Sequence, residues 1–316
     1  VIVLSQFCCT SLWFAGNGVM RDLVATFGLS KSAVGHLTSA VQFGFIIGTL
    51  VFAILSIADR FSPSKVFFGC AVLGAFFNLG VVWDGNGLAS ILSFRFFTGF
   101  FLAGIYPVGM KIAADYYEKG LGKSLGYLVG ALVVGTAFPH LLKEVTHTLS
   151  WNTVLVSTSG LAVLGGSLMI ALVPNGPYRK RSQQLQLSAF VQVFQNRNFR
   201  SAAFGYFGHM WELYTFWAFV PIMLQTYVLA HPNTHFPIPL LSFVIIAVGG
   251  LVAKNASAEI KGTALTIVNC IGFAITIVSI QLVNELRIWT DSNMVYMVLS
   301  IGPILGLIAL ASKKRG

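Results

Sequence analysis

Long runs of apolar residues, separated by short polar stretches, extend through the whole chain. A helix needs about 20 mostly apolar residues to cross the core of a bilayer, and ten segments reach or approach this length. The pattern predicts an all-α integral membrane protein. The ten expected spans are residues 1–20, 34–57, 66–83, 88–112, 122–142, 153–173, 202–229, 237–252, 262–284 and 293–312, of which 237–252 is short for a span.

The composition excludes the common soluble classes. Of the 316 residues, 56% are hydrophobic and only 9% are charged, whereas about a quarter are charged in soluble domains. A soluble enzyme, a disordered chain and a disulfide-stapled secreted domain are therefore excluded. The four cysteines lie in apolar runs without a CxxC pair, so we expect neither a metal site nor a cofactor.

The positive charges predict the topology. The net charge is +10, but the basic residues form short clusters between apolar runs, which favours membrane topology over nucleic-acid binding. With the first helix running outward, 15 of the 20 Lys and Arg residues fall inside, four fall outside and Arg95 lies within a span. We therefore expect cytoplasmic N- and C-termini. The expected divisions are a six-helix bundle at 1–173, a cytoplasmic linker at 174–200 and a second bundle at 201–316.

The second half looks shorter than the first. Leu12-Trp13 aligns with Leu213-Tyr214 at an offset of 201, whereas Lys123 and the residues after it align with Lys261 at an offset of 138. The difference of 63 residues is about two helices with their loops. We therefore expect ten spans of an original twelve, with the ninth and tenth missing between about residues 251 and 256; the alternative is a genuine ten-helix protein.

The two explanations of this gap differ in their consequences. If the segment were merely absent from the structure, consecutive α-carbons near residues 250–256 would lie much farther apart than ~3.8 Å. A true deletion would leave four helices in the second half, a gap beside the cavity and no coupled transport. Because the chain begins at Val1 without a basic stretch, we expect the first apolar run to be a span rather than a signal peptide, and the native start to be missing.

Four sequence stretches resemble signatures of the major facilitator superfamily. Ala58-Asp59-Arg60-Phe61 with Lys65 resembles the cytoplasmic signature G-x-L-A-D-R-x-G-R-K, and Arg95 to Gly99 resembles R-x-x-x-G. The glycines of the fifth span resemble the proton-antiporter signature, although Ala131 stands where that signature has Pro. Residues 11–17 and 209–213 are similar to a poorly characterised bacterial branch of the superfamily.

The resemblance implies two pseudo-symmetric bundles that work by alternating access around a central cavity. In this superfamily the first, fourth and seventh spans line that cavity. The implied solute-contacting residues are Asn17, Trp13, Tyr106, Trp211, Tyr214 and Trp217. Residues expected to serve helix packing or hinge motion are Gly99, Gly104, Gly126, Gly130, Gly135 and Pro139.

Three groups of charged residues are candidates for chemistry. Asp59, Arg60 and Lys65 are expected to form a conformational latch at the cytoplasmic ends of two helices, the alternative being a solvated turn. Arg95 inside a span is expected to bind an anion or sense a nearby carboxylate, the alternative being a structural role. His209 and Glu212 are three residues apart on one helix, so this pair could bind protons or fix the bundle.

The expected function is secondary transport of a small organic solute, with proton-coupled efflux by antiport. The alternatives are proton-linked uptake of an anion held by Arg95, or a non-transporting scaffold or truncated remnant. The chain lacks a P-loop, and we expect no enzyme activity. We expect a monomer in the inner membrane of a bacterium, with solute, protons and lipid as its partners and no nucleic acid.

Overall fold

The computed structural model describes residues 1–316 except 31, 118–120, 180–193, 254–261, 291 and 312–316. All regular structure in this described part is helical. The first six expected spans form α1 (Ile2–Thr10), α2 (Ala15–Gly18), α3 (Met20–Phe27), α4 (Ala33–Ile54), α5 (Ile57–Arg60), α6 (Pro63–Gly80), α7 (Leu88–Leu102), α8 (Tyr106–Ala114), α9 (Leu121–Val145) and α10 (Asn152–Leu172). We refer to α1–α10 as the N-terminal group.

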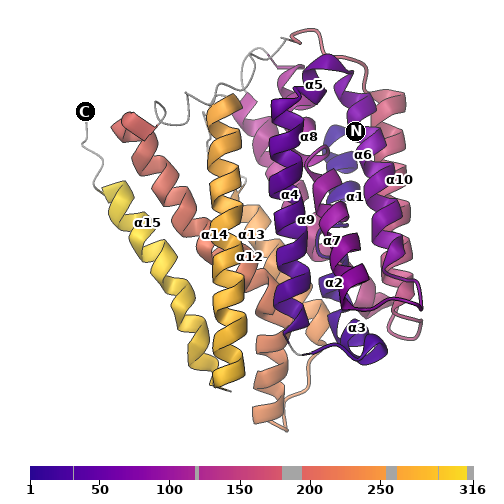
Figure 1. Cartoon of the computed structure of the whole chain (residues 1–316), viewed down its shortest axis with the longest axis vertical. Coiled ribbons are helices and arrows are strands. Elements are labelled where there is room, and N and C mark those ends of the chain that lie inside the picture. Colours follow the sequence, from indigo (N-terminus) through magenta and orange to yellow (C-terminus); the bar gives the residue numbers. More distant parts are fainter. Residues whose placement is uncertain (31, 118–120, 180–193, 254–261, 291, 312–316) are drawn as a thin grey trace.

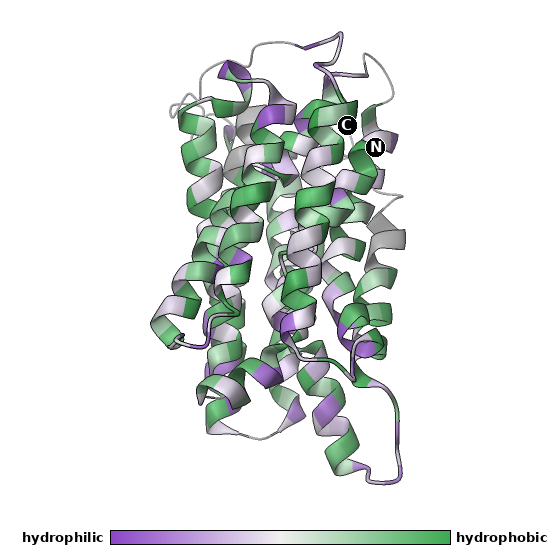
Figure 2. Ribbon diagram, turned by 90° about the vertical axis from the view of Figure 1, so that its right-hand side faces the viewer, coloured by the Kyte–Doolittle hydropathy of each residue, from purple (hydrophilic) through white to green (hydrophobic). Residues whose placement is uncertain are grey.

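The remaining helices form a smaller C-terminal group. It consists of α12 (Arg197–Ala230), α13 (Ile238–Ala253), α14 (Gly262–Trp289), the 3-10 helix η1 (Asn293–Ser300) and α15 (Ile301–Ala311). Figure 1 shows the two groups side by side, with α10 and α15 on opposite outer edges. In Figure 2 most of the length of the helices is hydrophobic and the hydrophilic residues gather toward the ends and loops, as expected for helices in lipid.

Eight described helices are long and apolar enough to span a membrane. They include six expected single helices, the η1–α15 pair and the α7–α8 pair, which is interrupted at residues 103–105 where Pro107 follows the start of α8. The segment Ile238–Val248 is apolar but shorter, as predicted. The expected single helix at 1–20 is wrong, because this segment breaks after Thr10 and again at Val19.

Helix packing repeats between the two groups. In the N-terminal group α1 packs on α9 and α10, and in the C-terminal group α12 packs on α14 and α15. Across the groups, α4 packs on α14 and α9 packs on α13. Every one of these contacts has its counterpart if α12, α13, α14 and α15 correspond to α1, α4, α9 and α10.

This correspondence leaves the C-terminal group without counterparts of α6 and α7. The chain is therefore truncated relative to a twelve-span arrangement, and the absent helices are the third and fourth of its second half. In the N-terminal group these two helices cover α10 and α4; the outer side of α15 is correspondingly exposed at Ile304, Leu307 and Ile308. At the expected site of the gap, residues 254–256 lie outside the described residues, so the continuity of the chain there is not described.

Two amide hydrogen bonds join the groups along α4 and α14. The Nε2 atom of Gln281 donates to Ser39 Oγ at 2.7 Å, and the Nδ2 atom of Asn284 donates to the Ser32 carbonyl at 3.3 Å. Gly35 makes room for the second contact, because a Cβ there would lie 2.6 Å from the Asn284 side chain. The interface between the groups is thus held by neutral polar contacts at this end.

Glycines allow α4 and α7 to touch through their backbones. A Cβ added at Gly99 would meet the Val41 carbonyl oxygen, and one added at Gly44 would meet the Phe96 carbonyl oxygen. Among the other predicted packing residues, Gly104 lies against Cys70, Gly135 lies against Thr10, and Pro139 lies against Gly18. Gly126 is buried within α9 and Gly130 is half-buried there.

We predict that Gly99→Ala destabilises the protein, whereas Gly160→Ala does not. The added methyl group at Gly99 must push α4 and α7 apart, and such overpacking typically costs about 1–3 kcal/mol. Gly160 of α10 has open space around it, so alanine there changes stability by no more than about 1 kcal/mol, in the stabilising direction. Thermal melting of both variants in detergent checks this; equal melting temperatures would contradict the backbone contact.

Candidate functional site

A break in the first segment creates the binding place for Arg95. The turn at residues 11–14 separates α1 from α2, so carbonyl groups there are available to partners outside the helix. From α7, the Arg95 guanidinium donates to the carbonyls of Leu12, at 3.3 Å, and Trp13. Gly16 leaves room for it, since a Cβ at Gly16 would lie 3.3 Å from Arg95 Nε.

A neutral network completes the surroundings of Arg95. Its Nη1 atom also donates to Asn78 Oδ1 at 3.0 Å, and the Asn78 amide donates in turn to Thr158 and Ser159 of α10 at 3.3 and 3.0 Å. Arg95 is only 1% exposed, and it takes part in no ion pair between described residues. The guanidinium is thus stabilised by carbonyl dipoles and amides, and it ties α7 to α1, α6 and α10.

Where the two groups meet, six rings form what we call the aromatic cluster. The ring of Trp13 lies 5.7 Å from Tyr214 and 5.6 Å from Phe273, both with interplanar angles of 23°, and 4.7 Å from Phe45. All four side chains are at most 3% exposed. The cluster consists of Trp13, Phe14, Phe45, Tyr214, Trp217 and Phe273.

Three more of the predicted solute-contacting residues have different surroundings. Tyr106 is half-buried and its phenol is close enough to that of Tyr214 for electrostatic interaction. Asn17 is buried and donates to Thr38 Oγ1 of α4 at 2.8 Å. Trp211 instead contacts η1 and α15, donating from Nε1 to the Val298 carbonyl at 3.1 Å. Trp211 therefore packs within the C-terminal group.

His209 and Glu212 lie on an exposed side of α12, away from the first segment. The two side chains do meet, with 3.4 Å between His209 Nδ1 and Glu212 Oε1, but they are 54% and 40% exposed. The side of α12 that meets the first segment carries Tyr214 and Trp217 instead. Residues two positions apart on a helix point in directions that differ by about 200°, so Glu212 and Tyr214 cannot face the same neighbouring helix.

Asp59 pairs with a cation that the sequence motif does not contain. Its carboxylate forms an ion pair with Lys111 near the end of α8, and Arg179 donates to the Asp59 carbonyl at 3.1 Å. Arg60 and Lys65 are exposed. This ion pair therefore joins α5 to α8 within the N-terminal group.

Asp115, at the end of α8, belongs to the same charged region. Burial raises the pKa of its carboxyl, and the charges of Lys111 and Arg179 oppose this shift. Its backbone carbonyl accepts from Tyr178 N at 3.0 Å, so residues after α10 pack onto the charged region. The contributions of Lys111, Asp115 and Arg179 were missed because nothing in the local sequence links them to Asp59.

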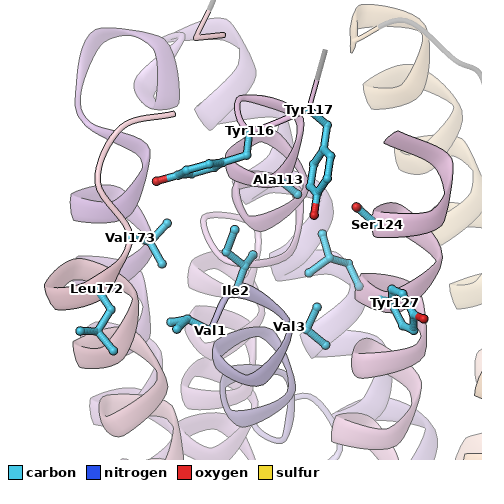
Figure 3. A pocket seen from close by; sticks show the side chains of 11 residues that line it. Val1, Ile2, Val3, Ala113, Tyr116, Tyr117, Ser124, Tyr127, Leu172 and Val173 are labelled. Carbon is cyan, nitrogen blue, oxygen red and sulfur yellow. The ribbon is translucent and has the colours of Figure 1, made fainter. Parts of the chain in front are cut away.

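A cavity of about 320 Å³ lies away from all predicted site residues. Figure 3 shows its lining, which includes Val1, Val3, Tyr116, Tyr117 and Tyr127. It opens where α1 begins, between α8, α9 and the end of α10. Among the described residues, no group of three His, Cys, Asp or Glu side chains is placed to hold a metal ion.

Comparison with known protein families decides the identity of the fold. The model of the Major Facilitator Superfamily matches residues 2–312. The chain belongs to the major facilitator superfamily. The protein is thus an integral membrane protein.

Two curated relatives of this superfamily member match part of it. It is 28% identical over 140 residues to the efflux pump FUB11 of Gibberella moniliformis. This matched stretch covers 43% of this chain and 23% of the relative. It is 26% identical over 142 residues to the D-galactonate transporter of Escherichia coli O6:H1, or 44% of this chain and 32% of the relative. The matched stretches therefore span less than two thirds of the relatives' lengths.

Solved structures of the superfamily share the fold over nearly the whole chain. The inward-open xylose transporter XylE from E. coli matches with a TM-score of 0.65 and 13% identity, covering 100% of this chain and 97% of that one. A mutant of the nucleoside transporter NupG matches with a TM-score of 0.59 and 13% identity, covering 98% of each chain. At this level of identity the likeness concerns the fold alone.

We predict that Arg95→Met strongly destabilises this superfamily member. The substitution leaves the Trp13 carbonyl and the Asn78 amide oxygen without their donor, at about 1–3 kcal/mol for each group left buried, and it leaves the Leu12 carbonyl with only the Ala15 N–H. Arg95→Lys retains the charge but not the forked donors, so an intermediate loss is expected. The control is Arg21→Met on α3, an exposed position where a change within about 0.5 kcal/mol is expected. Thermal melting in detergent measures all three variants. A melting temperature of Arg95→Met equal to that of the wild type would disprove the stabilising role of the network.

Proposed function

We propose that this protein is a secondary transporter that moves a small organic solute between its two helix groups by alternating access. The observation that carries the proposal is the aromatic cluster, to which the turn at residues 11–14, α4, α12 and α14 contribute. Its rings are closed against one another in this structure, so parting of the groups would uncover the face of Trp13. Aromatic walls of this kind suit organic solutes.

The contacts that flank the cluster support motion of the groups as units. The α4–α14 and α9–α13 contacts are the principal packing between the groups, and no ion pair joins the groups among the described residues. We propose that residues 1–173 and 201–316 are the moving units and that residues 174–200 link them. The Asp59–Lys111 pair would stabilise the N-terminal unit in one of its arrangements.

The direction we propose is export, driven by proton entry. Its supports are the partial likeness to a named efflux pump and the contact of His209 with Glu212, two side chains that can each carry a proton. The alternative of an anion held by Arg95 is less favoured, because neutral acceptors occupy that guanidinium. A non-transporting remnant remains the rival hypothesis, since the C-terminal group is truncated.

The proposed setting is a monomer in the inner membrane of a bacterium. Its support is the bias of Lys and Arg toward one set of loops, which places the N- and C-termini in the cytoplasm. The start of α1 and the end of α15 lie at the same end of the bundle (Figure 1), as this topology requires.

We predict that Trp13→Leu impairs transport of flat organic solutes. Purified protein is reconstituted in liposomes loaded with tritiated 2-naphthamide, a neutral flat solute, and efflux is followed by the loss of trapped label. Loss of ring stacking, worth about 0.5–1.5 kcal/mol per aromatic pair beyond burial, is expected to slow transport at limiting solute about three- to tenfold. Trp83→Leu, at a position that is 65% exposed, is the matched control and is expected to behave like the wild type.

The same assay separates the hypotheses. Besides 2-naphthamide, the probes ethidium, fluorescein and a labelled pentose cover cationic, anionic and non-aromatic neutral solutes. Equal rates for Trp13→Leu and wild type would exclude the aromatic cluster as the solute contact. Absence of transport for every probe, with the protein folded, would favour the non-transporting remnant.

We predict that Glu212→Gln abolishes accumulation driven by a pH gradient while solute exchange at equal pH continues. The variant cannot release a proton at this position, so the gradient loses its coupling group. Glu285→Gln, an exposed carboxylate on α14, is the control and is expected to retain accumulation. Accumulation of solute by Glu212→Gln against a pH gradient would exclude coupling through this residue.

A further inference from the structure

Gln42 lies on the face of α4 that meets the break in the first segment. Thr38, Gln42 and Phe45 are spaced four and three residues apart and share one face of the helix. Thr38 accepts a hydrogen bond from Asn17, and the Phe45 ring lies 4.7 Å from that of Trp13. Because its neighbours on both sides contact residues 13 and 17, Gln42 faces the same segment, beside the aromatic cluster.

The amide of Gln42 has no partner in this closed arrangement. Its side chain is 0% exposed, and neither Nε2 nor Oε1 makes a hydrogen bond. The indole Nε1 of Trp13, which is 1% exposed, is likewise unpartnered. A buried polar group without a partner lowers the stability of the fold. The Gln42 amide, which can donate and accept, and the Trp13 indole N–H, which can donate, are therefore available to bind a ligand at the aromatic cluster.

Charges around these groups point to an uncharged ligand. Arg95 and Asp115 are the only buried charged side chains in the described part of the chain. Asp115 belongs to the charged region at the end of α8, and Arg95 is engaged by the Leu12 and Trp13 carbonyls and by Asn78. A cationic solute would lose its hydration without meeting a carboxylate, and an anionic one would have to compete with the three neutral acceptors already bound to the guanidinium.

We propose that Gln42 and Trp13 select a neutral, flat solute that carries a carbonyl, amide or hydroxyl group. The ring of the solute would stack on Trp13 once Tyr214 and Phe273 separate from it, and its polar group would bind the Gln42 amide and the indole N–H. This inference rests on the proposed function, because it assigns a solute class to the same aromatic cluster. It makes Gln42 a specificity-determining residue of α4.

The test uses four naphthalene probes that share one ring and differ in charge and polarity. They are 2-naphthamide, 2-isopropylnaphthalene, 2-naphthoate and 2-naphthamidine, tritiated and measured by equilibrium binding to the purified protein with empty micelles subtracted. Wild type is expected to bind 2-naphthamide most tightly. Gln42→Met, which conserves volume but not the amide, is expected to weaken 2-naphthamide about tenfold and to leave 2-isopropylnaphthalene unchanged.

A matched control is available in Gln6 of α1. Its amide is also fully buried and unpartnered, but it contacts Gly109 of α8 rather than the aromatic cluster. Gln6→Met is expected to bind all four probes as wild type does. If Gln42→Met fails to fold, Gln42→Glu serves instead, and it is expected to gain affinity for 2-naphthamidine.

Each outcome bears on one proposal. Equal weakening of 2-naphthamide and 2-isopropylnaphthalene by Gln42→Met, or equal effects of Gln6→Met and Gln42→Met, would overturn the role of Gln42. Tightest binding of 2-naphthoate by wild type would overturn the neutral class and favour the anion hypothesis. Absence of binding for all four probes would overturn the aromatic cluster as a solute site, and with it the proposed function.

Discussion

The arrangement of the N-terminal group depends on a positive charge that must be stabilised inside a membrane protein. A buried guanidinium needs several acceptors, and Arg95 finds them where the first segment stops being helical. The break and the arginine depend on each other. The turn at residues 11–14 exposes the carbonyl groups of Leu12 and Trp13, and Arg95 donates hydrogen bonds to both. The same turn orients Trp13 toward Tyr214 and Phe273. An electrostatic requirement within one group thereby positions the rings that meet the other group.

The C-terminal group shows what remains of a repeat when two helices are removed. Its contacts reproduce those of α1, α4, α9 and α10 in the N-terminal group. Because α4 and α9 are the helices that meet α14 and α13 across the two groups, the interface retains both of its packing pairs. The outer helices have lost their cover instead, which leaves α15 with a largely apolar exposed side. The truncation therefore affects the periphery more than the centre.

Much of this architecture could be predicted from the sequence, but not the contacts that give it function. Apolar length alone located the long helices, and the two repeat offsets indicated the missing pair. The break near Leu12 was not predictable, because its residues are apolar and its cause, Arg95, is distant in sequence. The pairing of Asp59 with Lys111 was not predictable either, because the two residues are distant in sequence. The orientation of Glu212 could have been deduced, since a residue two positions from Tyr214 lies on the other side of the helix.

The neutral character of the contacts between the groups has a consequence for the energetics of exchange between conformations. Gln281 and Asn284 join α14 to α4 through amide hydrogen bonds. Each of the described ion pairs joins two residues of the same group, and none crosses between the groups. Dissolved salt screens charges but barely affects neutral hydrogen bonds or ring stacking. If the two groups part as proposed, the balance between closed and open arrangements would therefore be set chiefly by packing and temperature, and it would depend little on the ionic strength on either side of the membrane.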